Sequence, residues 1–386
     1  MFDAFAGLGV ITPLIAGLGK RNITIPTEIQ SEVIPGILSG KSLIAQSPTG
    51  TGKTLAYLIP LFQRIDRERR ENQVIVLAPT HELVIQIQRQ IEQLATDSEV
   101  GVTSASIIGN VNILRQIEKL KEKPQIIVGS AGRILELIQK KKIKAQTVRS
   151  IVIDEADRLL DDSNRDLVKA VIKTTLKDRQ LLLFSATITP ATQEQAQALM
   201  PESEVIVAGE QRVAAEIDHC YLVAEQREKI ELLRKLVHGI HGAQALVFLN
   251  KSDQIEMAVS KLTHHGLNAA GLFGSSSKND RQKALTDFRN RKVQLLVASD
   301  LAARGLDIFG VEYIISMDIP EEPEMYLHRA GRTGRAGAKG TSVVLLNPQE
   351  LQHVATYERK LGIRFAARKM LRGEMVALHS EKQERK

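Results

Sequence analysis

Residues 42–54 read SLIAQSPTGTGKT, and residues 55–65 continue as LAYLIPLFQRI. The opening SLIAQ is a short, mostly apolar run that ends in a polar residue, which is typical of a buried strand. The following SPTGTGKT consists of small and polar residues, and LAYLIPLFQRI has the pattern of a helix. The stretch therefore predicts strand, loop and helix in succession, which is the building block of an α/β fold.

The loop has the composition of a phosphate-binding loop. A phosphate chain needs backbone N–H donors that point inward, and Gly50 and Gly52 permit this because they carry no side chain. In such a loop Lys53 reaches the β- and γ-phosphates, and the Thr54 hydroxyl can bind Mg²⁺. Gln46 replaces the first glycine of the common pattern. With a strand before it and a helix after it, the loop predicts binding of a nucleoside triphosphate.

Further short apolar runs recur along the chain and alternate with amphipathic segments. Besides 42–46, we expect strands at 74–79, 125–130, 150–154, 181–187, 245–250, 268–274, 294–300, 313–318 and 341–347. Continuous apolar strands that alternate with helices indicate mainly parallel sheets covered by helices on both faces. Polar residues at the strand ends then lie along the carboxyl edge of the sheet, where open α/β folds bind ligands.

The strands form two sets, and each set predicts one domain of the same α/β layout. The polar stretch 208–219 has no strong period and is expected to be a linker. The predicted boundaries are an N-terminal domain at 1–207 and a C-terminal domain at 220–365. The basic end, 366–386, is interpreted as a frayed helix and tail, with an added RNA-binding arm as the alternative.

Composition narrows the class of partner. The chain of 386 residues has a net charge of +7, 4% aromatic residues and no tryptophan. The charge is compatible with a polyanion, and the lack of aromatic residues argues for contacts to a nucleic-acid backbone rather than base stacking. Cys220 is the only cysteine, so no internal disulfide forms and a reducing, cytoplasmic location is expected. No apolar run is long enough to span a membrane.

Asp154-Glu155-Ala156-Asp157 follows the expected strand at 150–154. A carboxylate at such a strand tip can hold Mg²⁺, partly through water, which assigns Asp154 to the metal together with Thr54. Glu155 is then placed to polarise the attacking water. Combined with the phosphate loop about 100 residues upstream, this pair predicts an ATPase core that uses ATP and Mg²⁺.

At this point the chain resembles the DEAD-box ATP-dependent RNA helicases of superfamily 2, since the letters DEAD stand at 154–157. The resemblance runs from about Phe5 to Gly340, and the compact length is similar to the small bacterial members. It implies two tandem RecA-like domains and an RNA-dependent ATPase that locally unwinds or remodels RNA duplexes. Closure of the two domains on ATP would also assemble the RNA-binding face, so the binding of ATP and RNA would be coupled.

The resemblance also implies roles for single residues. Gln30, in IPTEIQ, would read adenine, with Phe5 upstream of it, and Asp307 would hold the ribose. Arg332 and Arg335 would reach the γ-phosphate as arginine fingers and act in catalysis with Lys53, Asp154 and Glu155. The remaining nucleotide-binding positions are Thr49, Gly50, Thr51, Gly52, Lys53, Thr54 and Gly305.

A second group of residues would couple hydrolysis to RNA. The coupling residues implied by the resemblance are Asp157, Ser185, Thr187 and His328. The RNA-binding residues are Pro79, Thr80, Glu82, Gly109, Gly132, Arg133, Gly274, Arg281 and Asp300. The RNA-facing motifs depart more from the family pattern than the ATP-facing ones: His81 replaces an arginine and Asn110 a glycine. We expect a lower affinity for RNA, or additional RNA contacts supplied by a partner.

Three further features of the sequence concern possible ligands: an aliphatic residue near the adenine motif, a basic run and the histidines. Ile23 stands where the family keeps an aromatic residue that stacks on adenine, so we expect modest affinity for the nucleotide. The basic run Lys140-Lys141-Lys142, with Lys144 after it, either contacts RNA phosphates or is a solvated surface. The histidines have no partners at metal-ligand spacing, so a zinc site is not expected.

Two alternatives to an RNA helicase remain: a DNA helicase or translocase of the same superfamily, and an RNA-binding scaffold that has lost hydrolysis. Lys53, Glu155, Arg332 and Arg335 are all present, which argues against the scaffold. The resemblance suggests ribosomal RNA as the substrate, in ribosome assembly or RNA turnover. An activating protein or ribosomal particle is a candidate partner, and the expected oligomeric state is a monomer.

Overall fold

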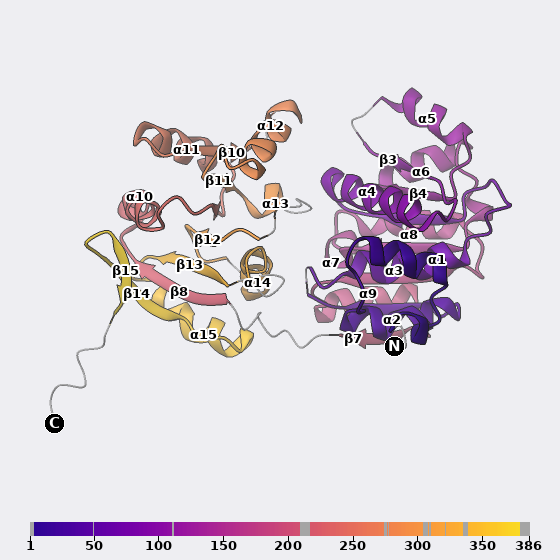
Figure 1. Ribbon diagram of the computed structural model, residues 1–386, viewed down its shortest axis with the longest axis horizontal. Coiled ribbons are helices and arrows are strands. Elements are labelled where there is room, and N and C mark those ends of the chain that lie inside the picture. Colours follow the sequence, from indigo (N-terminus) through magenta and orange to yellow (C-terminus); the bar gives the residue numbers. More distant parts are fainter. Residues whose placement is uncertain are drawn as a thin grey trace. The chain divides into compact units, whose positions relative to one another are not determined.

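The computed structural model describes residues 4–48, 50–109, 112–208, 217–273, 276, 278–303, 308, 310–320, 322–334 and 339–378. The chain forms two compact units, unit 1 (Met1–Gln211) and unit 2 (Arg212–Lys386), and each carries its own sheet (Figure 1). In the part described, no helix is long and apolar enough to cross a membrane.

Unit 1 contains a seven-stranded sheet in the order β3-β4-β2-β5-β6-β1-β7, and its strand pairs are parallel. Its strands are β1 (Leu43–Gln46), β2 (Val74–Leu77), β3 (Ser104–Ile107), β4 (Ile126–Gly129), β5 (Ser150–Asp154), β6 (Gln180–Ser185) and β7 (Glu204–Val207). Its helices are α1 (Thr12–Lys20), α2 (Glu28–Leu38), α3 (Lys53–Arg64), α4 (His81–Ser98), α5 (Ile113–Lys121), α6 (Ala131–Gln139), α7 (Ala156–Leu159), α8 (Arg165–Thr174) and α9 (Pro190–Leu199).

The sheet of unit 1 is buried on both faces. In β2, Val74 and Val76 pack into one apolar cluster, and Ile75 and Leu77 pack into another, because successive side chains point to opposite faces. Helices α1 to α4 contribute to the first cluster, and α5, α6, α8 and α9 to the second. This explains why the strands read as continuous apolar runs.

Unit 2 contains an eight-stranded sheet in the order β10-β11-β9-β12-β13-β8-β14-β15. Its strands are β8 (Ile217–Val223), β9 (Ala245–Phe248), β10 (Ala269–Leu272), β11 (Leu295–Ala298), β12 (Tyr313–Ser316), β13 (Gly340–Leu346), β14 (Ala366–Leu371) and β15 (Glu374–Ala377). Its helices are α10 (Lys229–Gly239), α11 (Gln254–His264), α12 (Lys278–Arg289), α13 (Asp300–Ala303), α14 (Pro323–Ala330) and α15 (Leu351–Leu361). Helices α10 and α11 pack on one face, and α12 to α15 on the other.

The expected α/β class is confirmed, and all ten expected strands are present. The interpretation of 366–386 as a frayed helix and tail is wrong for 366–377, which form the antiparallel hairpin β14–β15. Arg372 and Gly373 both have positive φ and make the two-residue turn. Met370 and Met375 pack against the apolar cluster of unit 2, and this burial holds the hairpin on the sheet. The expected linker also ends earlier, since β8 begins at Ile217.

Candidate functional site

The phosphate-loop sequence joins β1 to α3 at the carboxyl edge of the unit 1 sheet. Gly50 and Gly52 have φ of +87° and +89°, a left-handed conformation that strains any residue with a side chain. Gly52 is the N-cap of α3, and Lys53 and Thr54 lie in its first turn. The loop therefore ends at a helix N-terminus, where backbone N–H groups and the helix dipole favour an anion.

Side chains of the loop form hydrogen bonds within the loop itself. Lys53 Nζ donates hydrogen bonds to the carbonyl oxygens of Ser47, at 2.6 Å, and Pro48, at 2.8 Å. The hydroxyls of Ser47 and Thr51 lie 2.7 Å apart. These two bonds hold the lysine ammonium over the loop.

Gln30 connects the loop to the segment before it. Its Oε1 accepts from the backbone N–H of Thr27, at 3.0 Å, and its Nε2 donates to the Gly52 carbonyl, at 3.2 Å. The side chain is only 2% exposed. A methyl group on Gly52 would lie 2.5 Å from Gln30 Nε2, so a larger residue there would displace this amide in addition to straining the positive φ. Phe5 is buried in the apolar core of the unit, while Ile23 packs on the edge of that core.

The carboxylates lie at the end of β5, next to the loop in space. Asp154 Oδ2 accepts a 2.9 Å hydrogen bond from the Tyr57 hydroxyl, and Asp154 Oδ1 accepts one from the Glu155 N–H at 3.0 Å. Burial raises the pKa of Asp154, while the Lys53 charge and the Tyr57 hydrogen bond act to lower it. Glu155 adopts the left-handed conformation, with φ of +52°, at the N-cap position of α7.

Asp157 and Ser185 join the acidic motif to the next strand of the sheet. Strands β5 and β6 are neighbours, and Ser185 Oγ lies 2.7 Å from both Asp157 Oδ1 and the Thr187 carbonyl oxygen. The side chain of Asp157 is therefore hydrogen-bonded to the segment 185–187.

The expected RNA-binding residues of unit 1 follow β2, β3 and β4, which are adjacent strands. Thr80 caps α4 by accepting from the Leu83 N–H, and Pro79 and Glu82 flank it. Gly109 follows β3, and Gly132 lies in the first turn of α6. Arg133 pairs with Glu136 at 3.0 Å. These residues share the carboxyl edge with the phosphate loop.

In unit 2, the described arginines of the segment 328–335, Arg329 and Arg332, are both buried. Arg329, 1% exposed, forms a two-pronged ion pair with Asp300, with Nε–Oδ1 at 2.7 Å and Nη2–Oδ2 at 2.5 Å. It also donates to Asn250 Oδ1 and to the Asp318 carbonyl. Arg332 is buried just after α14, the helix that carries His328. Arg281 donates to the Ala302 carbonyl at 2.6 Å.

Several predicted site residues lie outside the described residues, namely Thr49, Gly274, Gly305, Asp307 and Arg335. Sequence reasoning missed Tyr57 and Asn250. Tyr57 stands inside the apolar pattern of a helix, which marks it as a core residue. Among the described residues, no group of three His, Cys, Asp or Glu side chains could hold a metal ion by itself.

Comparison with known proteins agrees with this geometry. The family model for DEAD/DEAH box helicase matches residues 27–196, and the model for the helicase conserved C-terminal domain matches residues 228–337. The chain is 42% identical over 350 residues to the DEAD-box ATP-dependent RNA helicase CshC of Bacillus cereus, covering 91% of this chain and 89% of that protein. It is 43% identical over 339 residues to the probable ATP-dependent RNA helicase YfmL of Bacillus subtilis, covering 88% and 89%.

Solved structures give the same result. Dbp5 of S. cerevisiae bound to RNA and ADP BeF3 matches with a TM-score of 0.84 and 27% identity, covering 95% of each chain. A DEAD box protein from the hyperthermophile Methanococcus jannaschii matches with a TM-score of 0.56 and 30% identity, covering 95% of this chain and 99% of that one.

Proposed function

The chain belongs to the DEAD-box helicase family and is an ATP-dependent RNA helicase; from this premise we propose which of its residues bind and hydrolyse ATP and which hold RNA. One observation carries the proposal. Three separate segments contribute Lys53, the adjacent pair Asp154 and Glu155, and Ser185, and the parallel sheet of unit 1 brings these segments to one edge.

The phosphate chain of ATP binds the loop at the N-terminus of α3. Lys53 exchanges its hydrogen bonds to the Ser47 and Pro48 carbonyls for phosphate oxygens, which are charged and therefore stronger acceptors. Gln30 reads adenine and, through its bond to the Gly52 carbonyl, links the base to the conformation of the loop.

Thr54 and Asp154 fit a magnesium ion, because Mg²⁺ prefers oxygen ligands and is held by one or two carboxylates or hydroxyls plus phosphate. The ion would supply charge neutralisation at the phosphates. Asp154 must be ionised for this role, and Lys53 and Tyr57 oppose the effect of burial on its pKa. Glu155 orients the attacking water as general base.

Arg332, together with Arg335, supplies positive charge to the γ-phosphate from the second domain. The pair of Asp157 and Ser185 transmits the state of the acidic motif to residues 185–187. RNA lies along Pro79, Thr80, Glu82, Gly109, Gly132 and Arg133 of unit 1 and near Gly274, Arg281 and Asp300 of unit 2. Hydrolysis and phosphate release would then let the two domains reopen and release a locally unpaired RNA strand.

Ribosomal RNA as substrate, an activating partner, a monomeric state and a cytoplasmic location are parts of the same proposal.

The test is steady-state ATP hydrolysis with no nucleic acid, with RNA and with DNA of the same sequence. We expect RNA to raise the rate and DNA to leave it unchanged. Glu155→Gln should lower kcat by at least about a hundredfold, the usual contribution of a general base, while ATP binding is retained. Glu28→Gln, an exposed site on α2, removes the same charge and serves as the control.

Two outcomes would change the assignment. Equal stimulation by RNA and DNA would favour a DNA helicase or translocase of the same superfamily. Binding of RNA without hydrolysis under all conditions would favour an RNA-binding scaffold.

A further inference from the structure

The positive charge of unit 1 is concentrated at the amino edge of its sheet, opposite the phosphate loop. Five loops lead into β4, β2, β5, β6 and β1, which are neighbours in that order. We call these loops the basic edge; they are residues 122–125, 65–73, 140–149, 175–179 and 39–42. They carry twelve lysines and arginines and five acidic residues.

The rest of unit 1 has the opposite balance. It carries thirteen lysines and arginines and nineteen acidic residues, so the unit as a whole is close to neutral. The basic edge is therefore a segregated patch and does not simply follow from a basic composition. A segregated positive surface concentrates a polyanion at one face.

Hydrogen bonds between neighbouring loops make the basic edge one continuous structure. Asn72 is central: its Nδ2 donates to the Pro124 carbonyl at 2.8 Å, and its own carbonyl accepts from the Thr147 hydroxyl at 2.7 Å. Farther along, Gln180 Nε2 donates to the Lys41 carbonyl at 2.7 Å. Five neighbouring strands at a spacing of about 4.8 Å span roughly 19 Å, enough to meet several successive phosphates.

The loop at 140–149 contributes the lysines that are best placed to bind phosphate groups. Lys141, Lys142 and Lys144 are exposed, and none forms an ion pair with a described residue. Lys140, in contrast, pairs with Glu136. These three ammonium groups can exchange counterions for phosphates without losing a protein partner.

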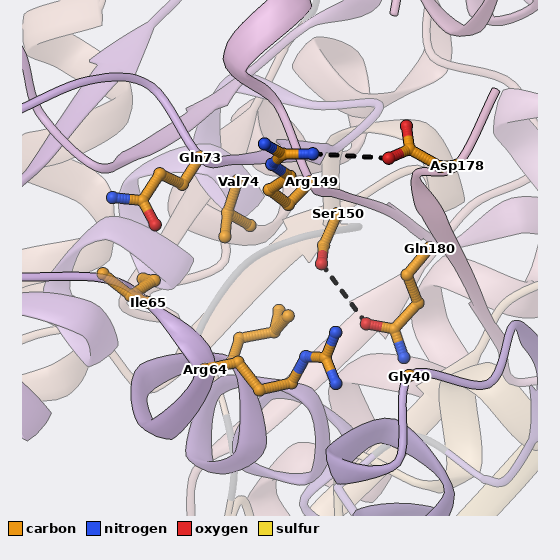
Figure 2. Close-up of a pocket in the computed structure, with 10 residues that line it drawn as sticks. Gly40, Arg64, Ile65, Gln73, Val74, Arg149, Ser150, Asp178 and Gln180 are labelled. Atoms are coloured by element: carbon orange, nitrogen blue, oxygen red, sulfur yellow. Dashed lines mark hydrogen bonds and ion pairs between the residues drawn. The ribbon is translucent and has the colours of Figure 1, made fainter. Parts of the chain in front are cut away.

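A recess opens beside this loop. Its volume is about 200 Å³, and Figure 2 shows the side chains of Arg64 and Arg149 on either side of the Ser150–Gln180 hydrogen bond. Arg149 pairs with Asp178 at 3.3 Å, and both side chains are more than half exposed, so a phosphate can compete for this guanidinium at little cost.

We propose that the basic edge is a second RNA-binding surface, which contacts the backbone of RNA beyond the segment held by the helicase motifs. The inference rests on the proposed function, because it takes RNA as the substrate. An acidic protein is a weaker fit. In these loops Leu176 is the single large apolar side chain that is well exposed, whereas protein interfaces have an apolar or aromatic centre.

The test compares two RNA probes. One is a short single strand that contacts only the RNA-binding residues named in the proposed function. The other is a duplex with a long single-stranded overhang. The variant is Lys141→Gln, Lys142→Gln, Lys144→Gln. We expect it to bind the long probe severalfold more weakly, with the slope of log affinity against log salt smaller by about 2, since each phosphate contact adds nearly one to that slope. Binding of the short probe should be unchanged.

Two controls separate position from net charge. Replacing Lys235, Lys261 and Lys360 by Gln removes the same charge from exposed helical positions of unit 2 and should leave the salt slope nearly unchanged. Replacing the three loop lysines by Arg should restore binding of the long probe. Addition of Arg149→Gln to the triple variant should lower the slope further.

Hydrolysis distinguishes this inference from the proposed function. In the triple variant, the rate without RNA and the rate at saturating long RNA should match the wild type, while the RNA concentration for half stimulation rises. A wild-type salt slope in the triple variant, or an equal loss in the unit 2 control, would overturn the basic edge as an RNA surface. Absence of RNA stimulation in the wild-type protein would instead overturn the proposed function, and with it this inference.

Discussion

The hydroxyl of Tyr57 donates a 2.9 Å hydrogen bond to the carboxylate of Asp154, and both side chains are buried. This bond ties the helix that follows the phosphate loop to the strand that carries the acidic motif. Burial and the neighbouring carboxylate hold the pKa of Tyr57 well above its usual value, so the phenol stays a donor throughout the working range of pH. Asp154 thereby keeps an acceptor role that favours its ionised form.

Tyr57→Phe should raise the pKa of Asp154, because burial already raises it and the variant removes a donor that opposes this effect. Ionised Asp154 is the form that binds Mg²⁺, so the acid limb of the pH profile of ATP hydrolysis should move to higher pH. Loss of the donor should also cost about 1–3 kcal/mol in the free energy of unfolding. Tyr221→Phe, on β8 of unit 2, is the control. An unshifted acid limb would exclude this role for Tyr57.

Gln30→Glu separates two functions of one side chain. A glutamate oxygen can still accept from the Thr27 N–H, so the cap of α2 is retained. The Nε2 donor to the Gly52 carbonyl is lost, and a carboxylate oxygen would face that carbonyl instead. We expect KM for ATP to rise roughly tenfold, the effect of about 1.4 kcal/mol, with little change in Tm. A large drop in Tm with an unchanged KM would show that Gln30 has only a structural role.

Ile23→Phe should lower KM for ATP about twofold to tenfold, since aromatic stacking contributes about 0.5–1.5 kcal/mol beyond area burial. Ile23 is half-buried at the edge of the unit 1 core, so part of its surface remains available. Ile25→Phe is the matched control, because Ile25 is two residues away and 76% exposed. Equal effects of both variants on KM would argue against a specific stacking position at residue 23.

The fold was largely predictable because the central strands are buried on both faces and therefore read as apolar runs. The strands that the sequence did not indicate lack this signal. Strand β3 contains two serines in four residues, and β7 lies at the edge of the sheet with mostly exposed side chains. The hairpin β14–β15 is rich in charge and is stabilised by packing of two methionines, which no local pattern reveals.

The positions of candidate site residues were predictable where a motif follows directly on an apolar strand, as for Lys53 in the loop motif after β1 and Asp154 at the end of β5. It was not predictable where tertiary contact assigns the role. Tyr57 has the appearance of a core residue, and its bond to Asp154 spans 97 positions of the sequence. Asp300 was predicted to contact RNA, and the structure shows its carboxylate as the partner of Arg329.

Arg329 and Arg332 stand three residues apart in one motif, and we expect different consequences from their substitution. The ion pair between Arg329 and Asp300 uses Nε and Nη2 of the guanidinium, and the third nitrogen, Nη1, donates to the Asp318 carbonyl. The guanidinium carbon of Arg329 lies 5.1 Å from the centre of the Phe248 ring. A lysine ammonium cannot reproduce this planar fork. Arg329 therefore organises the carboxyl edge of unit 2 around Asp300 and Asn250.

Arg329→Lys should lower the free energy of unfolding of unit 2 by about 1–3 kcal/mol, through lost hydrogen bonds in a buried site. Arg332→Lys should lower RNA-stimulated kcat by about a thousandfold or more, as expected of an arginine finger, with a smaller change in stability. Thermal unfolding and steady-state hydrolysis, measured on both variants and on the exposed control Arg359→Lys, separate the two roles. If Arg332→Lys unfolds the protein as strongly as Arg329→Lys and its kcat falls only in proportion to the folded fraction, Arg332 is a structural residue and the finger must be sought at Arg335.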